Sequence, residues 1–120
     1  MKERFLYCRK NVALADDDTH ADSAMFSISN FNGAYTESAG TIRLYFKNMH
    51  VTKGVTSGER DYVTITCTSG QESVVLKNVM EEFYNGSSNL ITLDSLTSGT
   101  TFDITGVTGV TTVVINGADT

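Results

Sequence analysis

Proline and tryptophan are absent from the 120-residue sequence, and charged residues make up only 19% of it. Proline cannot donate to the hydrogen-bond ladder of a sheet, whereas threonine favours strands, and 17 residues are threonine. The longest uncharged stretch, residues 104–118, is too short to span a bilayer and is interrupted by three glycines. The composition therefore favours a β-rich domain and excludes a coiled coil, a collagen and a transmembrane protein.

Cysteine is also scarce. Cys8 and Cys67 are too few for a disulfide scaffold, and each lies in a strand-like run, so we predict two buried free thiols. A disulfide remains the alternative if the two strands are neighbours, because its Cα atoms must come within roughly 7 Å. The first residues contain neither an apolar segment nor a small-residue cleavage site, so we expect no signal peptide and folding in a cytoplasm.

Positive charge is missing from residues 78–120, which carry the entire formal net charge of −5. An acidic segment repels phosphate, so we expect no nucleic-acid partner. The cations of the opposite end form a small basic cluster that consists of Lys2, Arg4, Arg9 and Lys10. Two interpretations stay open for this cluster: a solvated strand face, or a surface that docks onto an acidic protein.

Alternating apolar and polar residues predict strands, most clearly in residues 61–68. There Val63, Ile65 and Cys67 face one side, and Tyr62 with the threonines faces the other. Further strands are predicted at residues 4–8, 41–47, 89–94, 101–105 and 110–115. Residues 23–35 contain apolar anchors interrupted by asparagine and glycine, which indicates an extended or irregular segment.

One segment, residues 71–85, has helical spacing of its apolar residues. These residues are Leu76, Val79, Met80 and Phe83. Ser69 and Glu72 match a capping box, and Gly86 matches a C-terminal stop. The sequence thus predicts an α+β fold. It is a single domain, residues 1–120, with an antiparallel β-sheet or small β-sandwich of about six strands and one amphipathic helix.

The most ligand-like loop alternates acidic residues as a calcium loop does: Asp16, Asp18, His20 and Asp22. However, Ala21 occupies the position that needs glycine, and Ser27 occupies the position that needs a bidentate glutamate. The two cysteines and two histidines also lack the paired spacing of a zinc site. We therefore interpret the loop as solvated and predict no metal.

Catalytic motifs are not recognisable either. The sequence has no nucleophile elbow and no glycine-rich phosphate loop. Glu81 and Glu82 are adjacent on the predicted helix, where neighbours point about 100° apart, so they flank no common substrate atom. We predict a protein that is not an enzyme and needs no cofactor.

Five tyrosines could form an outward-facing platform: Tyr7, Tyr35, Tyr45, Tyr62 and Tyr84. Aromatic side chains on a sheet either stack on a ligand or fill a protein interface. We favour the interface and keep the ligand as the alternative.

The order of several segments adds one further observation. An N-terminal strand leads into an Ala-Asp-Asp-Asp stretch, and a run around Met25 and Phe26 follows. Next come the strand TIRLYFK, the strand DYVTITCT leading directly into the helix, and an end rich in valine, threonine and isoleucine. Together they resemble small structural proteins encoded by tailed phages of marine bacteria.

This resemblance implies a virion protein, made in the host cytoplasm, that decorates or cements the capsid. Its expected partner is the major capsid protein or another virion protein, and the expected state is a homo-oligomer such as a trimer. The basic cluster would then contact the shell. The alternative is a carbohydrate- or host-surface-binding module of a tail or head fibre that uses the outward tyrosines.

Overall fold

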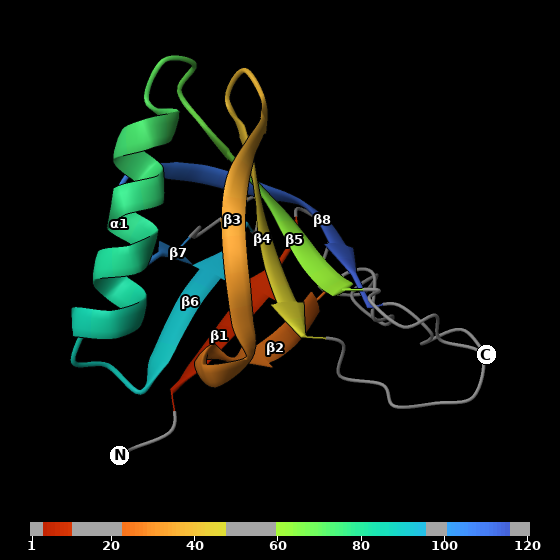
Figure 1. Ribbon diagram of the computed structural model, residues 1–120, viewed down its shortest axis with the longest axis vertical. Coiled ribbons are helices and arrows are strands. Elements are labelled where there is room, and N and C mark those ends of the chain that lie inside the picture. Colours follow the sequence, from red (N-terminus) through yellow and green to blue (C-terminus); the bar gives the residue numbers. More distant parts are fainter. Residues whose placement is uncertain (1–3, 11–22, 48–59, 96–100, 116–120) are drawn as a thin grey trace.

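The structure is a computed structural model that describes residues 4–10, 23–47, 60–95 and 101–115. In this part of the chain two four-stranded sheets pack against each other, and one helix runs along their side (Figure 1). The predicted α+β sandwich with one helix is confirmed. The acidic loop, Asp16–Asp22, and both histidines lie outside the described residues.

The first sheet has the strand order β2-β1-β6-β7. Its strands are β1 (Phe5–Arg9), β2 (Ser23–Ser27), β6 (Leu90–Asp94) and β7 (Thr101–Phe102). β1 pairs antiparallel with β2 but parallel with β6, so this sheet is mixed. The sequence analysis predicted only antiparallel pairing. Parallel neighbours need a long crossover, and here β2, three strands of the second sheet and the helix lie between them in the chain.

The second sheet is antiparallel throughout and has the order β3-β4-β5-β8. Its strands are β3 (Phe31–Ser38), β4 (Thr41–Lys47), β5 (Arg60–Cys67) and β8 (Val107–Val114). Residues 23–35, predicted only as extended or irregular, form β2, a short 3-10 turn and the start of β3. The ladder tolerates the interruption because its register shifts between Phe31 and Gly33, and Gly33 adopts φ 138°.

The core lies between the two sheets and is built from alternate residues of the central strands, such as Leu6, Leu44 and Ile65. Cys8 and Cys67 are both buried and unbridged, as predicted. Burial raises the pKa of each thiol, because the buried thiolate would lose its hydration.

Helix α1 (Glu72–Asn85) buries Val75, Val79 and Phe83, which are spaced by four residues. Met80 shares the helical spacing of the apolar residues, but it is not buried with them: its side chain is 48% exposed. The buried stripe is centred on Val79, so Met80 lies at its margin on the side of β3, where a groove separates the helix from the strand.

The predicted capping box at the start of α1 is wrong. The N-cap residue is Gln71, which makes no side-chain cap. The carboxylate of Glu72 instead accepts hydrogen bonds from the backbone N–H of Gly70 at 2.9 Å and of Gly40 at 2.6 Å. Gly40 occupies the β3–β4 turn with φ 73°, and a Cβ there would lie 2.9 Å from the carbonyl oxygen of Cys67. The cap is therefore tertiary and ties the helix to a distant turn.

We expect Glu72→Gln to destabilise the protein at neutral pH and much less in acid. The pKa of Glu72 lies below its ordinary value of 4.5, chiefly because the N–H of Gly40 donates to the carboxylate. A lowered folded-state pKa contributes stability above the unfolded-state pKa, and this contribution is lost as the pH falls through the folded-state value.

Thermal unfolding of the wild type and of Glu72→Gln over a pH series measures this effect. Glu81→Gln is the control, because the carboxylate of Glu81 is exposed on the same helix and accepts a hydrogen bond from the side chain of Asn85 one turn away. A melting-temperature difference between wild type and Glu72→Gln that stays constant from neutral to acidic pH would contradict the prediction.

Candidate functional site

Three tyrosines from neighbouring strands lie side by side on the outer face of the β3-β4-β5-β8 sheet. Tyr45 is the register partner of Tyr62, and the two ring centroids are 5.4 Å apart. Tyr35 is stacked on Tyr45 from the other side, also at 5.4 Å. Strand alternation places them there, because Leu44 and the other even-numbered residues of β4 point into the core. We call these three residues the tyrosine row.

Polar contacts hold the tyrosine row in one arrangement. The hydroxyls of Tyr35 and Tyr45 are 2.9 Å apart and share a hydrogen bond. Arg43 donates to the hydroxyl of Tyr45 at 3.4 Å, and its guanidinium carbon lies 4.6 Å from the ring centroid of Tyr62. Glu37 lies 3.7 Å from the same guanidinium. The surface is thus a pre-organised aromatic patch with a cation and an anion at its margin.

Two polar atoms beside the row keep unused hydrogen-bonding capacity. The Nε of Arg43 and the Oγ1 of Thr64 are shielded from solvent and have no hydrogen-bond partner among the described residues. Arg43 and Thr64 are register partners on β4 and β5, so the two atoms belong to the same face. Unpaired buried polar atoms are costly, so these two atoms lower the stability of this face of the sheet.

The hydrogen bonds of the row also separate the ionisation of its tyrosines. The pKa of Tyr45 lies below its ordinary value of 10.0, because Tyr35 and then Arg43 donate to its oxygen. The pKa of Tyr35 is raised, because its hydrogen bond to Tyr45 is lost when it ionises. Tyr45 therefore forms phenolate before Tyr35.

We expect Arg43→Gln to raise the pKa of Tyr45, because the variant removes a cationic donor from its oxygen. Ultraviolet titration of phenolate absorbance measures the change, and Tyr45→Phe identifies the transition that belongs to Tyr45. Lys47→Gln removes an exposed cation from the end of the same strand and serves as the control. An unchanged Tyr45 transition in Arg43→Gln would contradict the prediction.

The structure brings together three of the five tyrosines in the predicted platform and separates the other two. Tyr7 is half-buried on β1 in the opposite sheet, and Tyr84 is 58% exposed on α1. The alternation in residues 41–47 and 61–68 placed Tyr45 and Tyr62 outward, but residues 23–35 were predicted only as extended or irregular, without the strand that carries Tyr35.

A second exposed patch lies on the outer face of the other sheet, and the sequence analysis missed it. Phe5 is 38% exposed and is the register partner of Leu90, which is 42% exposed. Met25, which is 50% exposed, pairs with Tyr7 on the neighbouring strand. The sequence could not indicate this patch, because it depends on the pairing of three strands that lie far apart in the chain.

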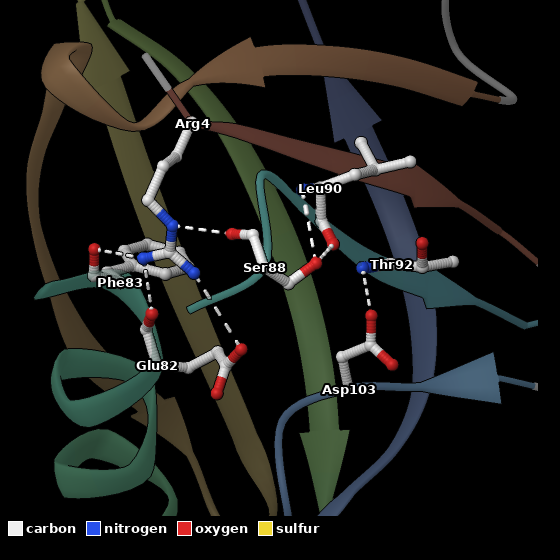
Figure 2. A network of polar contacts seen from close by, with 7 residues as sticks. All are labelled: Arg4, Glu82, Phe83, Ser88, Leu90, Thr92 and Asp103. Atoms are coloured by element: carbon white, nitrogen blue, oxygen red, sulfur yellow. Dashed lines mark hydrogen bonds and ion pairs between the residues drawn. The ribbon is translucent and has the colours of Figure 1, made fainter. Parts of the chain in front are cut away.

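The basic cluster of the sequence analysis is largely used within the fold. Arg4 donates to the carbonyl oxygens of Glu82 and Phe83, each at 2.6 Å, and to the carbonyl of Ser88 at 2.6 Å. Its guanidinium also lies 3.8 Å from the carboxylate of Glu82 (Figure 2). A cation at the C-terminus of a helix satisfies orphan carbonyls and complements the helix dipole. Arg4 therefore caps α1 from the N-terminal strand.

Arg9 corrects the interpretation more strongly, because it is only 1% exposed and cannot lie on a solvated or shell-contacting face of this fold. Its guanidinium lies 3.5 Å from Asp94, the register partner on β6, and this pairing offsets part of the cost of burying the charge. Lys10 is half-buried and makes contacts of its own, and Lys2 lies outside the described residues.

The carboxylates near the end of α1 are held in structural contacts. Glu81 accepts from the side chain of Asn85 at 3.1 Å, and Glu82 faces Arg4. Asp103 accepts from the backbone N–H of Thr92 at 2.8 Å, which fastens the segment after β7 to β6 (Figure 2).

Within the described ranges, no group of three or more metal-ligating side chains comes together. None of the described helices has the length and apolar character needed to cross a membrane.

Comparison with known proteins identified no relative. No family model, no curated protein and no solved structure matches the chain.

Proposed function

We propose that this chain is a non-enzymatic structural protein that works by binding the surface of another protein. The observation that carries the proposal is the tyrosine row with Arg43. Tyrosine and arginine are the residue types enriched at the energetic centres of protein interfaces. A row already held by stacking and hydrogen bonds loses little conformational entropy on binding.

We further propose that the partner is a virion protein, with the chain decorating or cementing a phage capsid. The resemblance described above supports this setting. The tyrosine row supports it too, because a sheet face already held by stacking and hydrogen bonds suits a protein whose work is to bury surface across subunit contacts.

Co-sedimentation of the purified protein with heads of the phage that encodes it tests the proposal. We expect saturable binding that Tyr35→Ala or Arg43→Ala weakens at least about tenfold, the cost of losing an interface hot spot. Met25→Ala is the matched control, because Met25 is 50% exposed on the opposite sheet and Tyr35 is 49% exposed. No binding to heads, or equal binding by all variants, would refute the proposal.

The oligomer implied by the resemblance remains part of the proposal. We expect a symmetric homo-oligomer, with a trimer as the specific prediction. Light scattering on a size-exclusion column should then give three times the 13.0 kDa chain mass. A chain that is monomeric both in solution and on the head would contradict this part.

A carbohydrate-binding function is the second candidate, and a specific observation favours it. The stacked rings of the tyrosine row form an outward aromatic face, which is suited to stacking against the C–H groups of a sugar. A glycan array probed at low and high salt distinguishes the candidates. Salt-insensitive glycan binding that Tyr35→Ala abolishes would replace the capsid proposal, and the absence of glycan binding would eliminate this alternative.

A further inference from the structure

A groove with a volume of ≈ 330 Å³ separates strand β3 from helix α1. Asn32, Gly33 and Ala34 line it on the strand side, and Leu76, Met80 and Tyr84 line it on the helix side. None of the described residues that line it is charged. Figure 1 shows α1 and β3 running beside each other along one side of the molecule.

The strand side of the groove is an open sheet edge. β3 is the terminal strand of its sheet, and one of its edges pairs with β4. No described residue pairs with the other edge. Natural edge strands are commonly protected by lysine or proline, and β3 contains neither; its one charged residue, Glu37, lies beyond residues 31–36. A Cβ on Gly33 would meet no atom within 4 Å, so the backbone can be approached closely there.

The helix side of the groove is an apolar stripe in which Leu76 is partly buried against the core and the other two side chains are exposed. Leu76, Met80 and Tyr84 are spaced by four residues and lie next to the buried stripe of α1. Met80 is 48% exposed and Tyr84 is 58% exposed. An apolar stripe beside an unpaired strand edge is the arrangement that recognises an added strand.

We propose that the groove between β3 and α1 binds an extended, uncharged peptide segment of a partner protein. The segment adds to β3 as an antiparallel or parallel strand and inserts apolar side chains against Leu76, Met80 and Tyr84. Charge complementarity selects an uncharged segment, because a charged side chain buried against this neutral lining would have no counter-ion.

The size of the groove selects a linear segment over a second folded copy of the chain. A stable interface between folded proteins buries roughly 800 Å² on each partner. A groove of ≈ 330 Å³ accommodates only a few side chains. A second copy, moreover, would bring its own α1 beside its own β3, and such a strand cannot enter between β3 and α1 of the first.

Selection from a displayed library of short random peptides tests the proposal, with calorimetry of the most enriched peptide as the readout. We expect a consensus of alternating apolar residues without charge. Met80→Lys should weaken binding at least about tenfold, and Val74→Lys should leave it unchanged within about twofold. Val74 is the matched control because it is also 48% exposed on α1 but does not line the groove.

Amide hydrogen exchange of the complex provides the second measurement. Between Asn32 and Thr36, bound peptide should protect the backbone amides that do not pair with β4 and therefore exchange rapidly in the unbound protein. Three results would overturn the proposal: no enriched peptide, equal affinity for Met80→Lys and the wild type, or binding that leaves these amides unprotected. Met80→Lys and Val74→Lys leave the tyrosine row unchanged, so both variants should still bind phage heads if the proposed function is right. Loss of peptide binding and loss of head binding are therefore separate results.

Discussion

Phe46→Ala is expected to destabilise the fold by about 3–5 kcal/mol, the usual cost of truncating a fully buried phenylalanine. Phe46 is 0% exposed, and its ring stacks on Phe26 with centroids 4.4 Å apart. Phe31 and Phe83 contact the same ring at centroid distances of 5.5 Å and 6.4 Å. The four rings come from β2, β3, β4 and α1, so the cavity would loosen both sheets and the helix together.

Chemical denaturation of Phe46→Ala beside the wild type measures this loss. Phe5→Ala is the control, because Phe5 is 38% exposed and its truncation leaves no enclosed cavity. A loss below about 1 kcal/mol in Phe46→Ala would mean that the four rings do not form the common support of the sheets and helix.

Arg4→Ala is expected to cost about 2–3 kcal/mol, because hydrogen bonds from a charged donor are the stronger class and several are lost at once. The side chain is only 14% exposed. It satisfies two carbonyls of the last turn of α1 and one of the segment that leads into β6. Without it, the C-terminal turn of the helix and the start of β6 should fray together.

Arg4→Lys distinguishes the geometry of the guanidinium from its charge. A lysine keeps the favourable interaction with the helix C-terminus but cannot reach three carbonyls in a fixed fork, so an intermediate stability is expected. Lys77→Ala, which removes an exposed cation from the same helix, should stay within about 0.5 kcal/mol of the wild type. Equal stability of Arg4→Ala and the wild type would contradict the capping role.

The two proposed surfaces use different physics and separate residues. The tyrosine row is a flat, pre-organised face that offers rings and one guanidinium. The groove beside β3 offers backbone groups and an apolar stripe. Tyr35 lies on β3 but faces Tyr45, whereas Met80 faces the groove, so variants at these two positions test the surfaces independently.

Local patterns in the sequence were sufficient for the fold class and for much of the candidate surface. Apolar and polar residues alternate strictly in residues 41–47 and 61–68, because a strand with one buried face has a repeat of two residues. This alternation predicted both strands and the outward direction of Tyr45 and Tyr62. The spacing of the apolar residues predicted the helix at 71–85, because this spacing follows from the repeat of about 3.6 residues per turn of a helix. The observed helix begins at Glu72, one residue later than predicted.

Only the tertiary structure decided how distant segments meet. The closeness of Arg4 and Arg9 in the sequence to other basic residues indicated a basic surface. In the fold, α1 covers Arg4 and Asp94 pairs with Arg9, and both partners come from positions far along the chain. The cap of Glu72 on Gly40 and the parallel pairing of β1 with β6 depend equally on long-range approach. Periodicity predicts which side of an element is buried. Packing between elements decides which group pairs with a charge, which strand edge stays unpaired and whether a side chain such as Met80 is covered.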